Sequence, residues 1–173
     1  KTKYNAKKYL MGSPAIGNLD DDDDLEIIFS GYSSDNKVFA INHDGTDVEN
    51  YPLILSEKVK SGVALADFNN NGKDDIVLGT DDNNLYLIYD DASIASGFPF
   101  TPIVNDDSPA RSASNKMQFA PSILDIGGEK VIFIGSSDNN FYAINSNGTQ
   151  RFKIQTNKDI VTSPSFLSYN GNK

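Results

Sequence analysis

In the stretch Ala66-Asp67-Phe68-Asn69-Asn70-Asn71-Gly72-Lys73-Asp74-Asp75-Ile76-Val77, oxygen-bearing side chains recur at alternate positions of one short loop between two apolar segments. A hard cation such as calcium takes six to eight oxygen ligands, and a glycine at the sixth position allows the sharp turn that gathers them. An EF-hand opens in this way, but Leu78 stands where its closing Glu belongs, and the short apolar flanks predict strands. The candidate ligands are the side chains of Asp67, Asn69, Asn71 and Asp75 and the backbone carbonyl of Lys73.

The same order of elements recurs along the chain. Four similar apolar segments begin near Pro14, Val63, Pro121 and Pro164, at intervals of roughly 40 to 60 residues. In the first three units a second strand ends in glycine, a polar Asn/Asp turn and a third strand follow, and a fourth, aromatic-containing strand closes the unit. Proline in the fourth strand of two units predicts the outer edge, because proline cannot donate to a β-ladder. Four antiparallel strands per repeat predict an all-β protein of the β-propeller type.

We expect about three complete four-stranded blades with a partial strand at each end. Residues 1–11 are predicted to be the outer strand of a preceding blade, 12–60 blade 1, 61–118 blade 2, 119–161 blade 3, and 162–173 the inner strand of a further blade. Three blades do not close a ring of four or more. The expected partners therefore include further propeller blades, from the parent chain or from an associated protomer.

The segment Ala64 to Gly79 resembles the FG-GAP repeat of the bacterial type often called VCBS, a family that also forms the propellers of integrin α-subunits. It matches the family pattern of an apolar strand, D-x-[DN]-x-[DN]-G-x-x-D, a second apolar strand and Gly, and the resemblance extends over nearly the whole chain. It implies a β-propeller with calcium in the loops between the first and second strands. Such propellers serve in adhesion, in ligand binding and as accessory domains of secreted enzymes.

Aligned on this pattern, the first unit offers a second calcium loop. Ile27 follows Asn18 by the same interval as Ile76 follows Asp67, which makes the ligand equivalents Asn18, Asp20, Asp22, the Asp24 carbonyl and Glu26. Asp23 departs from the pattern, because it stands where glycine is usual. The third unit lacks three loop residues and is expected to hold no calcium, so we predict two Ca2+ sites in all.

Composition narrows the possible partners. The net charge of −9 argues against nucleic acid and against anionic membrane surfaces. No stretch of about 18 apolar residues is present, so we expect no membrane insertion. The lack of cysteine excludes a disulfide framework and a thiolate nucleophile. An acidic, Asn-rich, calcium-binding β protein fits an extracellular or cell-surface setting.

The functional expectation is a non-catalytic, calcium-stabilised binding or scaffold module that recognises a protein or a carbohydrate. One alternative is an accessory propeller of an extracellular peptidase or polysaccharide-degrading enzyme, and a weaker one is a propeller like those of quinone-dependent dehydrogenases. The single histidine, His43, lies in a turn, which makes a Ser-His-Asp triad improbable. The long connector of residues 104–118 is the candidate binding segment, on the face opposite the calcium loops.

Overall fold

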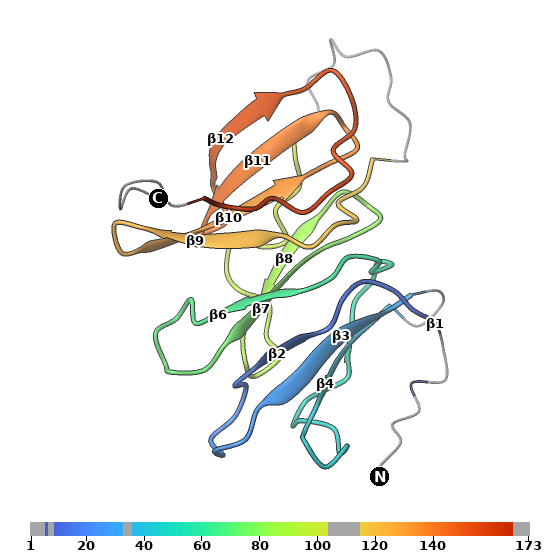
Figure 1. Ribbon diagram of the computed structural model, residues 1–173, viewed down its shortest axis with the longest axis vertical. Helices are drawn as coiled ribbons and strands as arrows, with labels where there is room; N and C mark the ends of the chain where they lie inside the picture. The colour runs from blue at the N-terminus through green and yellow to red at the C-terminus, as the bar shows by residue number, and fades with distance from the viewer. Residues whose placement is uncertain (1–5, 7–8, 33–35, 104–114, 168–173) are drawn as a thin grey trace.

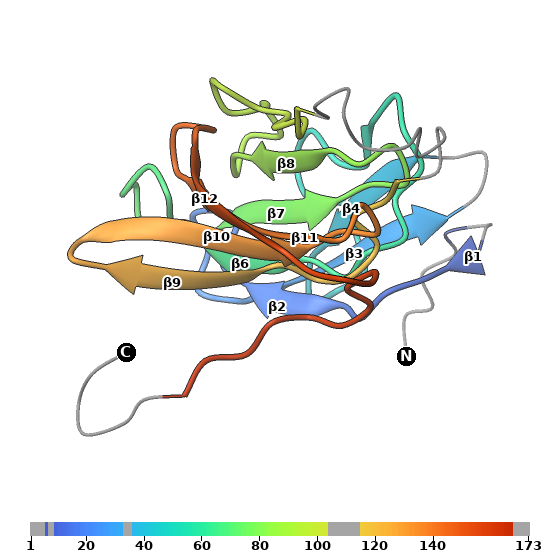
Figure 2. The ribbon, with the colours of Figure 1, turned by 90° about the horizontal axis from the view of Figure 1, so that it is seen from above.

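The computed structural model describes residues 6, 9–32, 36–103 and 115–167, and all the regular structure of these residues is β. Three antiparallel sheets follow one another along the chain, and Figure 1 shows them stacked along the long axis of the molecule. Their first strands, β2 (Ala15–Gly17), β6 (Ala64–Ala66) and β9 (Ser122–Ile126), lie next to one another, as Figure 2 also shows. The all-β, blade-by-blade architecture predicted from the repeat is confirmed.

Blade 1 is a meander in which each strand pairs antiparallel with the next. Its remaining strands are β3 (Glu26–Tyr32), β4 (Lys37–Ile41) and β5 (Leu53–Ile54). Pro52 directly precedes β5, which forms the outer edge of the sheet as the proline predicts.

The first described strand, β1 (Tyr9–Leu10), lies elsewhere than we expected. Instead of closing a preceding blade, it pairs antiparallel with the end of β3, Tyr9 opposite Tyr32 and Leu10 opposite Gly31. It therefore continues the inner edge of blade 1 beyond β2. The prediction failed because β3 is four residues longer than β2, and this segment pairs with the last two of them.

Blades 2 and 3 differ in how completely their outer edge is formed. Blade 2 contains β7 (Asp75–Gly79) and β8 (Leu85–Ile88), and its expected fourth strand is reduced to one bridge, in which Leu85 and Phe100 exchange backbone hydrogen bonds of 3.0 and 2.8 Å. Blade 3 has all four strands, with β10 (Glu129–Gly135), β11 (Asn140–Asn145) and β12 (Gln150–Gln155). Residues 162–167, part of the predicted inner strand of a further blade, form no strand.

Alternate residues of each second strand face the two neighbouring blades. In blade 2 the pair Ile76–Ile88 packs toward blade 1, whereas Val77 and Leu87 pack toward blade 3. The cross-strand pair Ile132–Ile144 of blade 3 repeats this arrangement against blade 2. All six side chains are fully buried, so the two larger parts of the core lie between blades. A smaller buried cluster of Val131, Phe133 and Ala143 lies on the far side of blade 3.

The outer faces of the two end blades carry apolar residues of the same kind. Ile27 and Ile41 of blade 1 pair as Ile76 and Ile88 do, but Ile27 is 36% exposed. On the far side of blade 3, Phe133 contacts the rings of Phe141, Phe152 and Phe166, and Phe152 is 41% exposed. We call these surfaces the blade 1 end face and the blade 3 end face.

The glycine that ends a second strand leaves room for the connector to the next blade. A Cβ at Gly79 would lie 2.3 Å from the backbone oxygen of Met117, and a Cβ at Gly135 would lie 2.2 Å from a methyl carbon of Ile160. Met117 precedes β9, and Ile160 precedes the segment of residues 162–167. In blades 2 and 3 this glycine is thus a packing requirement, whereas blade 1 has Ser30 at the equivalent register position.

Candidate metal centres

Two acidic loops lie at the same edge of the molecule. Loop 1 (residues 18–26) joins β2 to β3, and loop 2 (residues 67–75) joins β6 to β7. Both follow the end of an inner strand, and both project to the left in Figure 1. The corresponding link in blade 3 is a two-residue hairpin of Gly127 and Gly128, with φ of +66° and +88°. The strand register aligns Ile132, not Val131, with Ile76, so the link is two residues shorter than loop 2 and not three as predicted.

In loop 1, side-chain oxygens curl the backbone by accepting amides two residues ahead. Asp20 N donates to Asn18 Oδ1 at 3.2 Å, Asp22 N to Asp20 Oδ1 at 3.0 Å, and Asp24 N to Asp22 Oδ1 at 2.8 Å. This curl brings carboxylate oxygens of Asp20, Asp22 and Glu26 within 4.8 Å of one another. The Asp24 side chain instead pairs with His43 Nδ1 at 3.0 Å on the exposed surface.

Glu26 distinguishes this cluster from an ordinary acidic surface. Its side chain is fully buried, Oε2 accepts the Leu19 amide at 2.6 Å, and Oε1 has no hydrogen-bond partner among the described residues. Burial raises the pKa of Glu26, the Leu19 amide opposes that rise, and the charges of Asp20 and Asp22 add to it. An unpartnered buried carboxylate oxygen beside two further carboxylates fits the oxygen set that a calcium ion takes.

Loop 2 repeats the same ladder with amide side chains in place of carboxylates. Asn71 N donates to Asn69 Oδ1 at 3.0 Å and Lys73 N to Asn71 Oδ1 at 2.9 Å, while Asp67 accepts the amides of Asn71 and Gly72. Gly72 has φ of +90°, as the predicted turn requires, whereas Asp23, its counterpart in loop 1, does not adopt a positive φ.

Asp75 is the counterpart of Glu26, but both of its oxygens have partners. Oδ2 accepts the Phe68 amide at 2.7 Å and Oδ1 accepts the Asp90 amide at 3.2 Å. Burial raises the pKa of Asp75 to about 6, against the lowering effect of these amides. Asp90 also accepts from Asn71 Nδ2 at 2.8 Å, which ties the end of β8 to loop 2.

The two loops contact each other across the boundary between the blades. Asn18 N donates to Asp74 Oδ2 at 3.1 Å, and Asp74 N donates to the Asn18 carbonyl at 2.6 Å. A Cβ at Gly17 would lie 2.5 Å from Asp74 Oδ2, so a larger residue there would displace the Asp74 side chain. Lys73 Nζ adds an ion pair of 3.0 Å with Asp21 and lies 3.7 Å from Asp90. Two of these bonds join a predicted ligand residue of loop 1 to loop 2.

The structure therefore gathers the predicted side chains of each loop, and it adds two residues that sequence reasoning missed. Asp74 was passed over because its role depends on packing between blades. Asp90 carried no repeat signal either, since the equivalent residues in blades 1 and 3 are His43 and Ser146. Of the predicted binding segment 104–118, residues 104–114 lie outside the described part of the chain.

Residues 18–78, which span loop 1, loop 2 and the strands between them, match the family described as FG-GAP-like repeat. This stretch is similar to an FG-GAP-like repeat. The match supports the resemblance drawn from the loop motif, and it covers both acidic loops. No curated protein matches the sequence.

Solved structures support the propeller fold. BamB from Moraxella catarrhalis is similar with a TM-score of 0.58 and 16% identity, over 88% of this chain and 39% of that one. The C-terminal domain of Pseudomonas aeruginosa PilY1 is similar with a TM-score of 0.56 and 16% identity, over 80% of this chain and 39% of that one. BBS1N, solved in complex with ARL6DN, is similar with a TM-score of 0.51 and 14% identity, over 84% of this chain and 40% of that one. The chain thus spans about two fifths of the length of each, and identities this low establish the fold alone.

Within the described residues, no helix has the length and apolar character needed to cross a membrane.

Proposed function

We propose that loops 1 and 2 each hold one calcium ion and that the chain is a calcium-stabilised, non-catalytic propeller module. The observation that carries the proposal is Glu26 Oε1, a buried carboxylate oxygen that receives no hydrogen bond from the part of the chain that the structure describes. Burying an ionised carboxylate costs free energy, and the single hydrogen bond from the Leu19 amide offsets only part of that cost. A divalent cation held by Asp20, Asp22 and Glu26 removes that cost and the repulsion among the three charges.

Loop 2 supports the second site through its similarity to loop 1. Asp67, Asn69 and Asn71 stand at the same loop positions as Asn18, Asp20 and Asp22, and Asp75 begins its strand as Glu26 does. The amide oxygens of Asn69 and Asn71 are also hard ligands, although they carry no charge. We therefore expect loop 2 to attract calcium less strongly by charge than loop 1 does, but to need less rearrangement of its turn.

The role of the ions in this proposal is structural, and the function is recognition. Calcium fixes the turn between the inner strand and the second strand of two blades, so that the opposite face is held as a rigid surface for a protein or carbohydrate ligand. An extracellular or cell-surface location fits, because free calcium is abundant there. No catalytic role is proposed, since the only histidine, His43, pairs with Asp24 on an exposed turn.

We also propose that further blades of the same repeat cover both end faces. Ile27 occupies the register position at which Ile76 and Ile132 are fully buried by a neighbouring blade. Phe133 likewise stands at the position of Val77, and its aromatic neighbours Phe152 and Phe166 are more than 40% exposed. Repeat proteins bury such faces by stacking on the next unit. Whether the parent chain or a second protomer supplies the blades is decided by measuring the mass of longer and shorter versions of the chain in solution.

The test is calorimetric titration of the metal-stripped protein with calcium, combined with thermal unfolding. We expect two sites, and filling each to a hundred times its Kd adds about 2.7 kcal/mol of stability. Asp20→Ala should remove one site and Asp67→Ala the other. Asp125→Ala, at the equivalent position in the blade 3 hairpin, is the matched control and should leave both intact. No binding heat at millimolar calcium would refute the proposal.

A further inference from the structure

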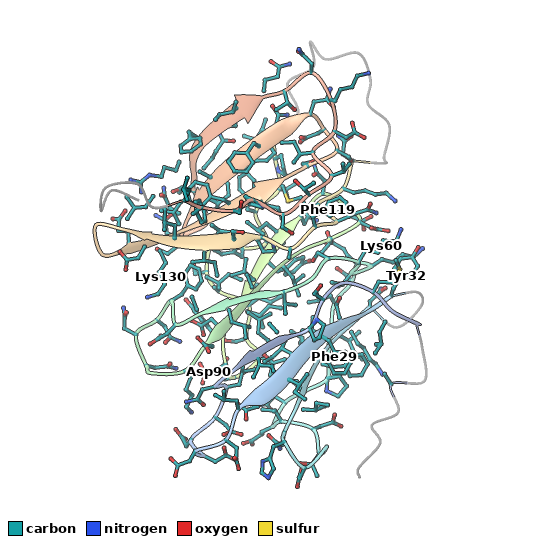
Figure 3. The ribbon with its side chains drawn as sticks, viewed as in Figure 1. Phe29, Tyr32, Lys60, Asp90, Phe119 and Lys130 are labelled. Atoms are coloured by element: carbon teal, nitrogen blue, oxygen red, sulfur yellow. The ribbon has the colours of Figure 1, made fainter. Side chains whose placement is uncertain are left out.

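A cavity of about 360 Å3 opens where the inner strands begin, at the end of the molecule opposite loops 1 and 2. Its walls come from the connectors that lead into β2, β6 and β9, and from Ser163 in the last described segment. Figure 3 shows Lys60, Tyr32 and Phe119 on this side and Asp90, which contacts loop 2, on the other. We call it the axial cavity. It lies on the face that the proposed function assigns to ligand binding, and in this respect the inference rests on that function.

The floor of the axial cavity is rigid. A Cβ at Gly12 would lie 2.5 Å from the Ser61 carbonyl oxygen, so the two inner connectors are in backbone contact. Buried hydroxyls fix this contact: Ser30 Oγ donates to the carbonyls of Met11 at 3.1 Å and Ser61 at 2.8 Å, and Ser61 Oγ donates to Gly79 at 2.9 Å. A preformed floor loses little conformational freedom when a ligand binds.

One charge and several apolar groups define the chemistry of the walls. Among the described residues that line the cavity, only Lys60 is charged, and its ammonium lies 4.7 Å from the centre of the Tyr32 ring. That cation–π contact restrains the ammonium at the rim. Met11, Phe119 and Ala120 supply apolar surface. A cation above an apolar pocket is suited to a ligand that carries a carboxylate next to an apolar side chain.

The hydrogen-bonding groups favour a peptide over a sugar. The described lining offers the hydroxyls of Ser13 and Ser163 and the amide of Gln118, and Gln118 Nε2 already donates to Asp81 Oδ1 at 2.7 Å. A sugar ring brings many hydroxyl groups, and each one buried without a partner weakens binding. We propose that the axial cavity binds a peptide carboxylate flanked by an apolar side chain, with Lys60 as the anchor for the charge.

The experiment uses N-acetyl-L-phenylalanine as probe and its uncharged amide as the matched ligand, each titrated into the 15N-labelled protein while amide shifts are recorded. We expect saturable shifts at the cavity residues Gly12, Gly62 and Phe119, with a Kd on the order of a millimolar for so small a ligand. The amide should bind about tenfold more weakly. Equal affinity for acid and amide, shifts elsewhere, or saturable binding of glucuronate in place of the probe would each overturn the inference.

Variants separate the charge from packing. Lys60→Met keeps the aliphatic stem and should weaken binding of the acid about tenfold without changing that of the amide, whereas Lys60→Arg should retain the preference for the acid. Lys58→Met, which removes a lysine outside the axial cavity on the same face, should change neither. All titrations are run with calcium and with chelator. If calcium does not raise the unfolding temperature but the acid still binds more tightly than the amide, only the calcium proposal is refuted. If calcium raises the unfolding temperature but the folded protein does not prefer the acid, only the proposal for the axial cavity is refuted.

Discussion

Loops 1 and 2 occupy the same place in consecutive blades, yet they differ in charge and in the shape of the turn. Loop 1 has three carboxylates within 4.8 Å and no glycine turn, and its buried Glu26 leaves one oxygen unpartnered. Loop 2 has a glycine turn at φ +90°, neutral Asn side chains, and a buried Asp75 whose two oxygens are both satisfied. In the proposed sites, charge would hold the ion in loop 1 and the preformed turn would hold it in loop 2. The metal-free forms should therefore differ more than the calcium-bound ones.

The largest effect is expected from Glu26→Gln. In the metal-free protein the change removes an unpaired buried charge, so unfolding should become harder by about 1–3 kcal/mol. In saturating calcium the same change removes the loop 1 site and its linked stabilisation of about 2.7 kcal/mol. Thermal unfolding with chelator measures the expected gain in stability, and thermal unfolding with calcium measures the expected loss.

Asp75→Asn is the matched change in loop 2. Both Asp75 oxygens are already hydrogen-bonded, so the metal-free protein should gain little or lose stability. Equal behaviour of the two variants without calcium would remove the distinction between the loops.

A second effect concerns communication between the loops. Asp74→Ala removes the acceptor for Asn18 N and leaves the loop 2 ligands in place. We expect calcium affinity at loop 1 to fall about tenfold, with a smaller change at loop 2, because a coupling free energy between sites is commonly 1–3 kcal/mol. Two-site calorimetry measures it.

The control for charge is Asp82→Ala, which removes one carboxylate from the opposite face of the molecule. An equal loss of affinity in that variant would mean that net charge, and not the contact between Asn18 and Asp74, is responsible.

A third comparison concerns turn shape. Gly72→Ala meets no atom within 4 Å, so its cost comes only from the backbone at φ +90° and should be about 1–2 kcal/mol, seen as weaker calcium binding at loop 2. Asp23→Ala at the equivalent place in loop 1 carries no such cost, because Asp23 does not have a positive φ. If calcium binding drives Asp23 to the positive φ of Gly72, Asp23→Ala will also weaken calcium binding at loop 1. That result would mean that the two loops have the same conformation in the calcium-bound protein.

The smallest effect is expected at Lys73. Its ammonium pairs with Asp21 at 3.0 Å at the boundary of the two loops, and exposed ion pairs contribute at most about 1 kcal/mol. Lys73→Met should lower metal-free stability slightly and raise calcium affinity at loop 1 a few-fold, because a competing cation is removed. Added salt should reduce both effects. A lower affinity would show that Lys73 positions the ligands.

The sequence contained enough to predict the blades and both acidic loops, because these follow from local spacing. The pairing of Tyr9–Leu10 with β3 could not be predicted, since it depends on the unequal lengths of β2 and β3. The contact of Asp74 with Asn18 joins residues from different blades, and no periodic pattern marks it. Asp90 could not be predicted from the repeat, because the equivalent residues of blades 1 and 3 are His43 and Ser146.

The glycines at 79 and 135 also bear on where such a chain can be divided. Each is covered by a residue of the connector that leads into the following unit, Met117 and Ile160 respectively. An expression boundary placed directly after the outer strand β12 would leave the second strand of blade 3 uncovered at Gly135. A boundary placed beyond Ile160 keeps that cover, so the unit that can be moved between proteins extends past its fourth strand into the next connector.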